Sequence, residues 1–243
     1  NVKVALSGDG GDELFCGYNR YILADKRSKQ FNLIPILLRK ILAHGIKSID
    51  SNIINNIFKL LPGKIESSNF THKMKKGASA LESKTFYELY HILCSDWINP
   101  SDVVLNIKEP EMSFGHLENK LFKLNNHQKM MILDLMNYLP NDILVKTDLA
   151  SMSNSIELRS PFLNTEVFNA AWSLPIKSKV SKNSGKLVLN NILKKHLPQN
   201  LFDRPKQGFA IPIDSWLRNS LSKWAKEIIF DYKGQDSYFN NKI

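Results

Sequence analysis

The stretch that most constrains this chain of 243 residues is VKVALSGDGGDELFCGYNRY, which occupies residues 2–21. Its beginning, VKVALS, predicts a short buried strand in the interior of a parallel sheet, because it is rich in Val and Ala and ends at glycines. The residues from Asp12 onward predict one helix, DELFCGYNRYILADKR, with carboxylates in its first turn. The SGDGGDE segment therefore gathers three glycines and three carboxylates at the carboxyl end of a strand.

A turn of this composition is able to carry chemistry. Ligands of open α/β sheets bind at the carboxyl ends of strands, where glycines let the backbone approach a phosphate closely. Asp9, Asp12 and Glu13 would repel a polyphosphate, so we expect Mg²⁺ to bridge them to it. A tight turn with an acidic helix cap explains the same residues equally well. The segment matches neither GxxxxGKS/T nor GxGxxG, so it is not a standard phosphate or dinucleotide loop.

The remainder of the chain predicts a mostly helical body. The predicted helices cover 31–44, 52–61, 85–94, two pieces of 116–139 that stop at Pro140, the segment DILVKTDLASMSNS capped by Asn141 and Asp142, 164–173, 184–197, and a last helix capped by Asp214. The polar segment 63–80 predicts a loop that is rich in Lys and Ser. One strand cannot form a sheet, so we expect its neighbours to come from outside this sequence or from strands without a clear pattern.

Composition argues against several classes of partner. No apolar run reaches the roughly 18 residues that a membrane span needs, so no membrane partner is expected. Cys16 and Cys94 cannot build a disulfide framework, which indicates a reducing cytoplasm. The net charge of +10 raises the question of nucleic acid, but the basic clusters are short and no aromatic residues interleave with them. The pattern therefore favours solvated helix faces, and it leaves a homodimer open.

A second stretch that is able to carry chemistry is DILVKTDLASMSNSIELRSPFLN, residues 142–164. Lys146 and Asp148 are charged residues in a helix that is otherwise small and apolar, and Ser151 shares a face with Asp148. Small residues allow such a helix to lie close to a ligand, or equally to another helix. Glu157 and Arg159 follow the helix, and their spacing is most simply explained by a structural ion pair.

A third stretch is RPKQGFAIPIDSWLR, residues 204–218, in which Pro205, Gly208 and Pro212 indicate a shaped loop. Lys206 lies on this loop. A lysine in such a place is able to bind phosphate or to stabilise a developing negative charge. A surface lysine beside a turn is an equally simple interpretation.

Taken together, the three stretches resemble the synthetase domain of the glutamine-dependent asparagine synthetase family. They are similar to its SG(D/E)G(G/S)DExFxGY, LVKxDRASMxxSxExRxPFLD and KxGFxxPxxxWLR segments, in the same order. The resemblance implies an α/β fold, in which residues 1–243 form the mostly helical C-terminal part of a parallel-sheet nucleotide-binding domain of the ATP pyrophosphatase, HUP-like type. The family's SGGxDS pyrophosphate loop and its N-terminal glutaminase domain are absent from this sequence, so we expect this chain alone to be incomplete as an enzyme.

The resemblance also implies an activity and roles for residues. The family uses MgATP to convert a carboxylate, usually that of aspartate, into an acyl-adenylate, and ammonia from glutamine then forms the amide. Ser7 and Gly8 match positions that contact the nucleotide, and Asp9 matches a carboxylate needed for the acyl-adenylate step. Asp12 matches a ligand of Mg²⁺ on pyrophosphate. Lys206 matches the lysine that steadies the transition state.

Asp148, Glu157 and Arg159 match motif positions that shape the cofactor site. The departures from the family pattern are Cys16 for Gly, Leu149 for Arg and Asn164 for Asp. None of them removes a proposed catalytic group, but they leave the acceptor open between aspartate and a carboxylate on a sugar or a peptide. An interpretation from another class also stays open, in which the chain is a non-catalytic, basic helical module that binds a protein or RNA partner.

Overall fold

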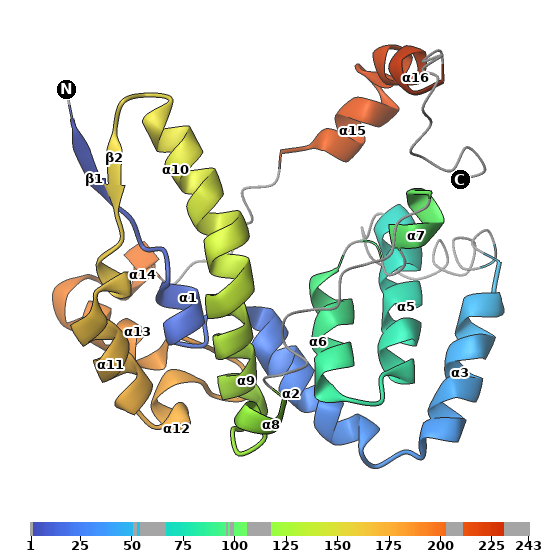
Figure 1. Cartoon of the computed structure of the whole chain (residues 1–243), viewed down its shortest axis with the longest axis horizontal. Helices are drawn as coiled ribbons and strands as arrows, with labels where there is room; N and C mark the ends of the chain where they lie inside the picture. The colour runs from blue at the N-terminus through green and yellow to red at the C-terminus, as the bar shows by residue number, and fades with distance from the viewer. Residues whose placement is uncertain are drawn as a thin grey trace. The chain divides into compact units, whose positions relative to one another are not determined.

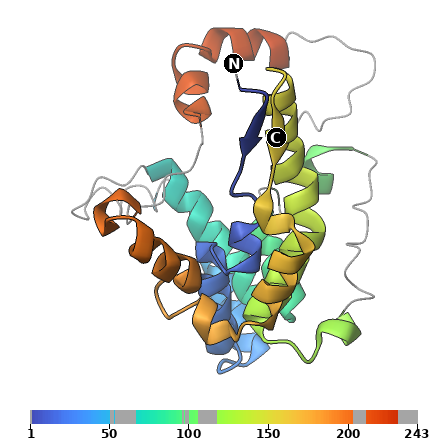
Figure 2. The same ribbon diagram turned by 90° about the vertical axis from the view of Figure 1, so that its left-hand side faces the viewer.

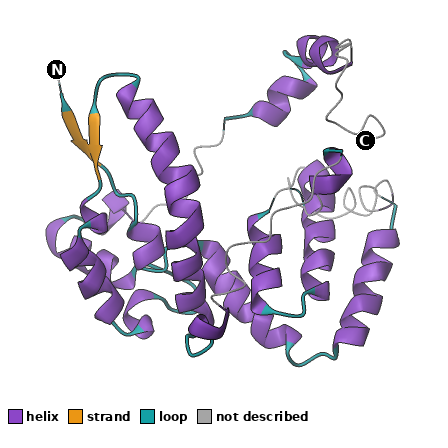
Figure 3. Cartoon of the chain, in the orientation of Figure 1, coloured by secondary structure: helices purple, strands orange, loops and turns teal. Residues whose placement is uncertain are grey.

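The structure is a computed structural model, and it describes residues 2–50, 53, 67–95, 97, 100–105, 118–202 and 211–230. Over these residues it is a mostly helical α/β fold with a small parallel sheet (Figure 3). The chain divides into two compact units, one of residues 1–98 and 112–192 and one of 99–111 and 193–243. Most of the predicted helix 52–61, and Lys206, lie outside the described residues.

The sheet joins two segments that are far apart in the sequence. Strand β1 (Val4–Leu6) pairs in parallel with β2 (Glu157–Arg159), with Ala5 opposite Leu158. The predicted strand in VKVALS is therefore confirmed, whereas its predicted burial is wrong. Val4 is 40% exposed and Leu6 74% exposed, because β1 pairs along one edge only among the described residues. The sequence pattern did not reveal β2, since it has three residues and begins and ends with a charge.

The chain leaves β1 through SGDGGDE and forms two helices instead of the one that was predicted. Helix α1 (Gly11–Leu14) ends after four residues, and α2 (Asn19–Phe31) begins after a break. Cys16 lies in this break with a left-handed φ of 54°, which is incompatible with a continuing helix. The backbone of Gly185 packs directly against it, since a Cβ atom at residue 185 would lie 1.9 Å from the carbonyl oxygen of Cys16.

A long continuous helix runs beside the strands and consists of α9 (Asn126–Leu133), the π-helix η2 (Asp134–Ile143) and α10 (Leu144–Met152) (Figures 1 and 2). The prediction that Pro140 stops a helix and that Asn141 and Asp142 cap a new one is therefore wrong. Proline removes a donor and crowds the preceding turn of an α-helix, and the wider π-helical turn accommodates it. The helix begins instead at Asn125, which forms a capping box with Gln128.

The other helices of the structure overlap the predicted ranges 31–44, 85–94, 164–173 and 184–197, and they also include short ones that the pattern did not predict. In chain order they are α3 (Ile36–Ser48), α5 (Ser67–Glu82), α6 (Phe86–Cys94), α7 (Pro100–Val103), α8 (Glu118–Leu121), η3 (Pro161–Leu163), α11 (Thr165–Ser173), α12 (Ile176–Lys179), α13 (Leu187–His196), α14 (Gln199–Phe202), α15 (Ile213–Arg218) and α16 (Ser222–Phe230). No helix among the described residues is long and apolar enough to cross a membrane.

Two predictions about these helices are wrong. The predicted loop 63–80 is helical from residue 67, because the polar segment packs along α3 and buries Ala78 and Ala80. An ion pair of 2.6 Å between Lys47 and Glu82 also joins α3 to α5. The last predicted helix is divided into α15 and α16, and Asp214 is the second residue of α15 instead of its cap.

The core places α1 against the long helix. One buried cluster contains Cys16, Tyr21 and Met131, which bring together the end of α1, α2 and α9. A second cluster contains Leu14 and Ala171, so α1 also packs on α11. A four-residue helix is not stable by itself, and these contacts hold it at the carboxyl end of β1.

The close contact at Gly185 leads to a stability prediction. Gly185→Ala is expected to lower the free energy of unfolding by about 3 kcal/mol, because the new Cβ would collide with backbone at Cys16. Gly45→Ala is the matched control, since residue 45 lies inside α3 with open space around it and should gain about 0.5–1 kcal/mol. Urea denaturation of both variants checks this, and equal effects would contradict the packing.

Candidate functional site

The carboxyl ends of the two strands bring three polar side chains together. The hydroxyl of Ser7 donates to Oδ2 of Asp9 over 2.9 Å and lies 2.8 Å from the hydroxyl of Ser160. Because a hydroxyl has one proton to donate, Ser160 is the donor in the second contact. The pairing of the strands positions this group, since the backbone N–H of Ser7 donates to the carbonyl of Arg159.

A cavity of about 360 Å³ lies beside this group. Its lining residues come from the long helix, from β2 and from the residue that follows β2, and they are Pro140, Leu144, Val145, Thr147, Asp148, Leu158 and Ser160. Asp148 and Ser160 therefore border one space, although Asp148 lies in α10 and Ser160 follows β2. Pro140, Leu144 and Asp148 follow one another at steps of four residues, which places them on one face of the helix.

Asp12, the predicted metal ligand, is held by a lysine that sequence analysis did not single out. The Nζ atom of Lys186 lies 3.0 Å from Oδ2 of Asp12, and the two side chains are 29% and 31% exposed. Gly17 makes room for this pair, because a Cβ atom at residue 17 would lie 1.9 Å from Oδ1 of Asp12. No signal in the sequence could have shown this contact. Lys186 is far from Asp12 along the chain and lies in a segment of ordinary polar residues.

The fit of a metal ion depends on Asp12. Among the residues that the structure describes, no three His, Cys, Asp or Glu side chains gather as a complete metal cage. Mg²⁺ is commonly held by one or two carboxylates together with phosphate oxygens and water, and a partly exposed Asp12 suits that arrangement. Lys186 beside it would attract the same phosphate groups.

Glu13 is not placed to act as a metal ligand, which corrects the expectation for the third carboxylate of the turn. Its side chain is buried at 1% exposure, and Oε1 accepts a hydrogen bond of 2.6 Å from the hydroxyl of Tyr18. Burial raises the pKa of Glu13, and the hydrogen bond from Tyr18 offsets part of that rise. Glu13 therefore faces the protein interior.

Glu157 and Arg159 form the ion pair that their spacing predicted, with 2.8 Å between Nε and Oε1. Arg159 lowers the pKa of the exposed Glu157 carboxyl through a hydrogen bond and its charge. Side chains alternate along a strand, so the two lie on the face of β2 opposite to Leu158 and Ser160, which line the cavity. Their role in cofactor binding stays a prediction.

Gly8 lies at the turn itself. Its carbonyl accepts the N–H of Gly11 over 3.2 Å, and a Cβ atom there would meet nothing within 4 Å. The structure thus leaves open space beside this backbone. Of the predicted site residues, Lys206 lies outside the described part of the chain.

Polar groups at the carboxyl ends of parallel strands, beside a cavity, mark this α/β protein as one with a candidate ligand site at the ends of its strands. A family model described as asparagine synthase matches residues 1–243, and the chain belongs to that family. The family is one of enzymes.

Curated relatives agree with this membership. The chain is 30% identical over 235 residues to glutamine-hydrolyzing asparagine synthetase 1 of Bacillus subtilis, a match that covers 94% of this chain and 34% of that protein. It is 31% identical over 237 residues to a putative asparagine synthetase of Mycobacterium bovis, covering 93% and 32%. The chain thus spans about a third of the length of these relatives. No solved structure matches it with significance.

The burial of Glu13 leads to a prediction about pH. Below its ordinary pKa of 4.5 the carboxyl is protonated in both the folded and the unfolded states. Because its pKa is raised in the folded state, the carboxyl keeps its proton to a higher pH there than in the unfolded state. The free energy of unfolding of the wild type therefore falls as the pH rises through that raised value. Glu13→Gln is therefore expected to gain stability relative to the wild type from about pH 4.5 toward neutrality. Urea denaturation across this range measures the difference, and a constant difference would contradict the burial of the carboxyl.

Proposed function

We propose that the intact protein carrying this chain is a ligase that forms an amide on a carboxylate at the expense of ATP. The substrate that the family favours is aspartate, which would become asparagine. The reaction would pass through an acyl-adenylate and release AMP and pyrophosphate, with ammonia from glutamine. Membership of the asparagine synthase family supports this proposal, as do relatives that are named glutamine-hydrolyzing asparagine synthetases.

The observation that carries the proposal is the meeting of Ser7, Asp9 and Ser160 beside a cavity that Asp148 also lines. Hydroxyls and a backbone with open space around Gly8 would contact the nucleotide. Asp9, oriented by the hydroxyl of Ser7, would lie next to the acyl-adenylate. Asp148 would border the same ligand from the long helix.

Charge neutralisation would take place at Asp12. Adenylation spreads negative charge over a leaving pyrophosphate, and cations placed in advance stabilise such a transition state. Asp12 would hold Mg²⁺, which supplies Lewis acidity to the phosphate oxygens when it is bound. Lys186 would orient Asp12 and add a positive charge, and Lys206 would provide a second one.

We further propose that residues 1–243 form the C-terminal part of a HUP-like synthetase domain, with a glutaminase domain and a pyrophosphate loop elsewhere in the intact protein. The chain spans about a third of the length of its relatives, which supports this proposal. The exposure of Val4 and Leu6 on β1 also supports it, because further strands or helices would cover such apolar side chains.

Pyrophosphate release from MgATP by the intact protein, measured over a panel of free amino acids, sugar acids and peptides, tests the reaction and identifies the acceptor. Asp12→Asn is expected to lower kcat about 100-fold or more, because the Mg²⁺ that would stabilise negative charge in the transition state loses its carboxylate ligand. Asp25→Asn is the matched control, since Asp25 forms an ion pair with Lys29 on α2 and should change kcat less than about twofold. No pyrophosphate release with any carboxylate would overturn the proposal.

The lysine on the loop gives a separate prediction. Lys206→Ala in the intact protein is expected to lower amide synthesis about 100-fold while leaving the Tm nearly unchanged, because a loop lysine contributes charge rather than packing. Thermal denaturation next to the activity assay distinguishes the two roles. A large fall in Tm would instead indicate a structural role.

A further inference from the structure

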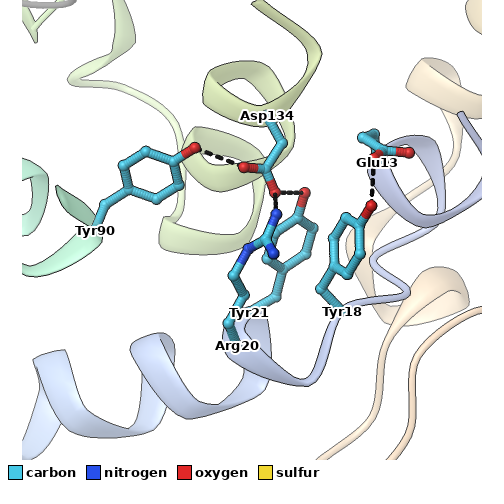
Figure 4. Close-up of polar contacts among 6 residues, drawn as sticks. All are labelled: Glu13, Tyr18, Arg20, Tyr21, Tyr90 and Asp134. Atoms are coloured by element: carbon cyan, nitrogen blue, oxygen red, sulfur yellow. Dashed lines mark hydrogen bonds and ion pairs between the residues drawn. The ribbon is translucent and has the colours of Figure 1, made fainter. Parts of the chain in front are cut away.

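A buried carboxylate lies behind the candidate site, and none of the proposed roles uses it. Asp134 opens the π-helix η2 and is fully buried. Its Oδ2 accepts from Nη2 of Arg20 over 2.6 Å and from the hydroxyl of Tyr21 over 2.5 Å. Its Oδ1 accepts from the hydroxyl of Tyr90 over 2.5 Å (Figure 4). Three donors, two from α2 and one from α6, thus satisfy both oxygens of this buried charge.

Arg20 is the cation of this cluster, and aromatic rings hold its guanidinium in place. The guanidinium carbon lies 4.0 Å from the ring centre of Tyr18 and 4.6 Å from that of Tyr138. Burial by itself would lower the pKa of Arg20, but the charge and the hydrogen bond of Asp134 raise it overall. Arg20 therefore stays charged, and it attracts the face of each ring as well as the carboxylate.

Tyr18 extends this cluster to the candidate site. Its ring lies against Arg20, while its hydroxyl donates to Oε1 of Glu13 over 2.6 Å (Figure 4). Glu13 belongs to α1 and directly follows Asp12. At the other end, Asp134 and Asp148 belong to one continuous helix. An unbroken chain of contacts, Glu13–Tyr18–Arg20–Asp134, therefore joins the two elements that present Asp12 and Asp148.

The short length of α1 makes such a connection necessary. A helix of four residues lacks the cooperativity to hold its own shape, and α1 is followed by the left-handed residue Cys16. Glu13 is buried and hydrogen-bonded to Tyr18, so its fixed side chain limits the rotation of α1 and with it the direction of the neighbouring Asp12. A hydrogen bond between charged or strongly polar groups defines that direction more narrowly than apolar packing does.

We propose that Asp134 is a positioning residue, which acts through Arg20 and Tyr18 to hold α1, and with it Asp12, at a set place relative to Asp148. This inference rests on the proposed function for what Asp12 binds. Asp134 itself is not among the residues that line the cavity or that form the hydroxyl group at the strand ends. Asp134 thereby keeps Asp12, on the metal–phosphate side of the site, at a fixed position relative to the helix that lines the cavity.

Two variants interrupt the chain at different links, and a third is their control. Tyr18→Phe removes the hydroxyl that holds Glu13 and keeps the ring over Arg20. Asp134→Asn removes the charge that holds Arg20. Tyr90→Phe makes the same chemical change as Tyr18→Phe and also removes a hydrogen bond of this network, but Tyr90 comes from α6 and donates to Oδ1 of Asp134, outside the path from Oδ2 through Arg20 and Tyr18 to α1.

Amide hydrogen exchange over residues 8–17 in the intact protein is the first measurement, because it reports the order of α1 whether or not the protein is active. Tyr18→Phe and Asp134→Asn are each expected to speed exchange there about tenfold, and their double variant no more than that. Tyr90→Phe should change it less than about twofold. Binding of magnesium pyrophosphate, measured by calorimetry, should weaken about tenfold in the first two variants and stay unchanged in the control.

The outcomes separate this inference from the proposed function. Unchanged exchange over residues 8–17 in folded Tyr18→Phe would overturn the positioning role, and so would an equal effect of Tyr90→Phe. If Asp134→Asn does not fold, Tyr18→Phe against Tyr90→Phe still decides the matter, since each loses a single hydroxyl. An intact protein that releases no pyrophosphate with any carboxylate would overturn the proposed function alone, because the exchange comparison does not depend on catalysis.

Discussion

The parallel pairing of β1 with β2 is the contact on which the candidate site depends. It brings Ser7 next to Ser160, which lies 153 residues further along the chain, and it directs both side chains to one face of the sheet. The same pairing places β2 along α10, and so sets Asp148 beside Ser160 at the cavity. Three residues on each strand thus define where polar groups from two distant motifs meet.

Close packing around glycines gives the second constraint. Gly17 and Gly185 leave no room for a Cβ atom, and their contacts hold the left-handed break at Cys16 and the ion pair between Asp12 and Lys186. The break turns α2 away from α1, so that Tyr18 is able to reach back to Glu13. The glycine-rich turn and the buried carboxylate of Glu13 are therefore parts of one arrangement. In it, the partly exposed Asp12 is held by Lys186 and by the fixed position of its neighbour Glu13.

Much of the secondary structure could be predicted from local pattern, and the failures have physical causes. Apolar periodicity predicted α3, α6, α11 and α13, because their apolar residues recur at the helical repeat. It failed at Pro140, where a π-helical turn accommodates the proline, and at Cys16, where packing against Gly185 imposes a left-handed residue. The prediction of a loop from residue 67 onward failed for a related reason. Contact with α3 stabilises a helix there that the polar composition of the segment does not favour.

The sequence by itself determined the strand before SGDGGDE, the helical body and the three motifs that indicate the asparagine synthase family, because these depend on residues near one another in the chain. Only the tertiary structure decided which carboxylates of the turn are buried and which stay partly exposed. Asp12 points to Lys186 and Glu13 points into the core, although they are neighbours of similar chemistry. The physical reason is that burial and pairing depend on partners such as Tyr18, Arg20 and Lys186, whose approach follows from the packing of whole helices.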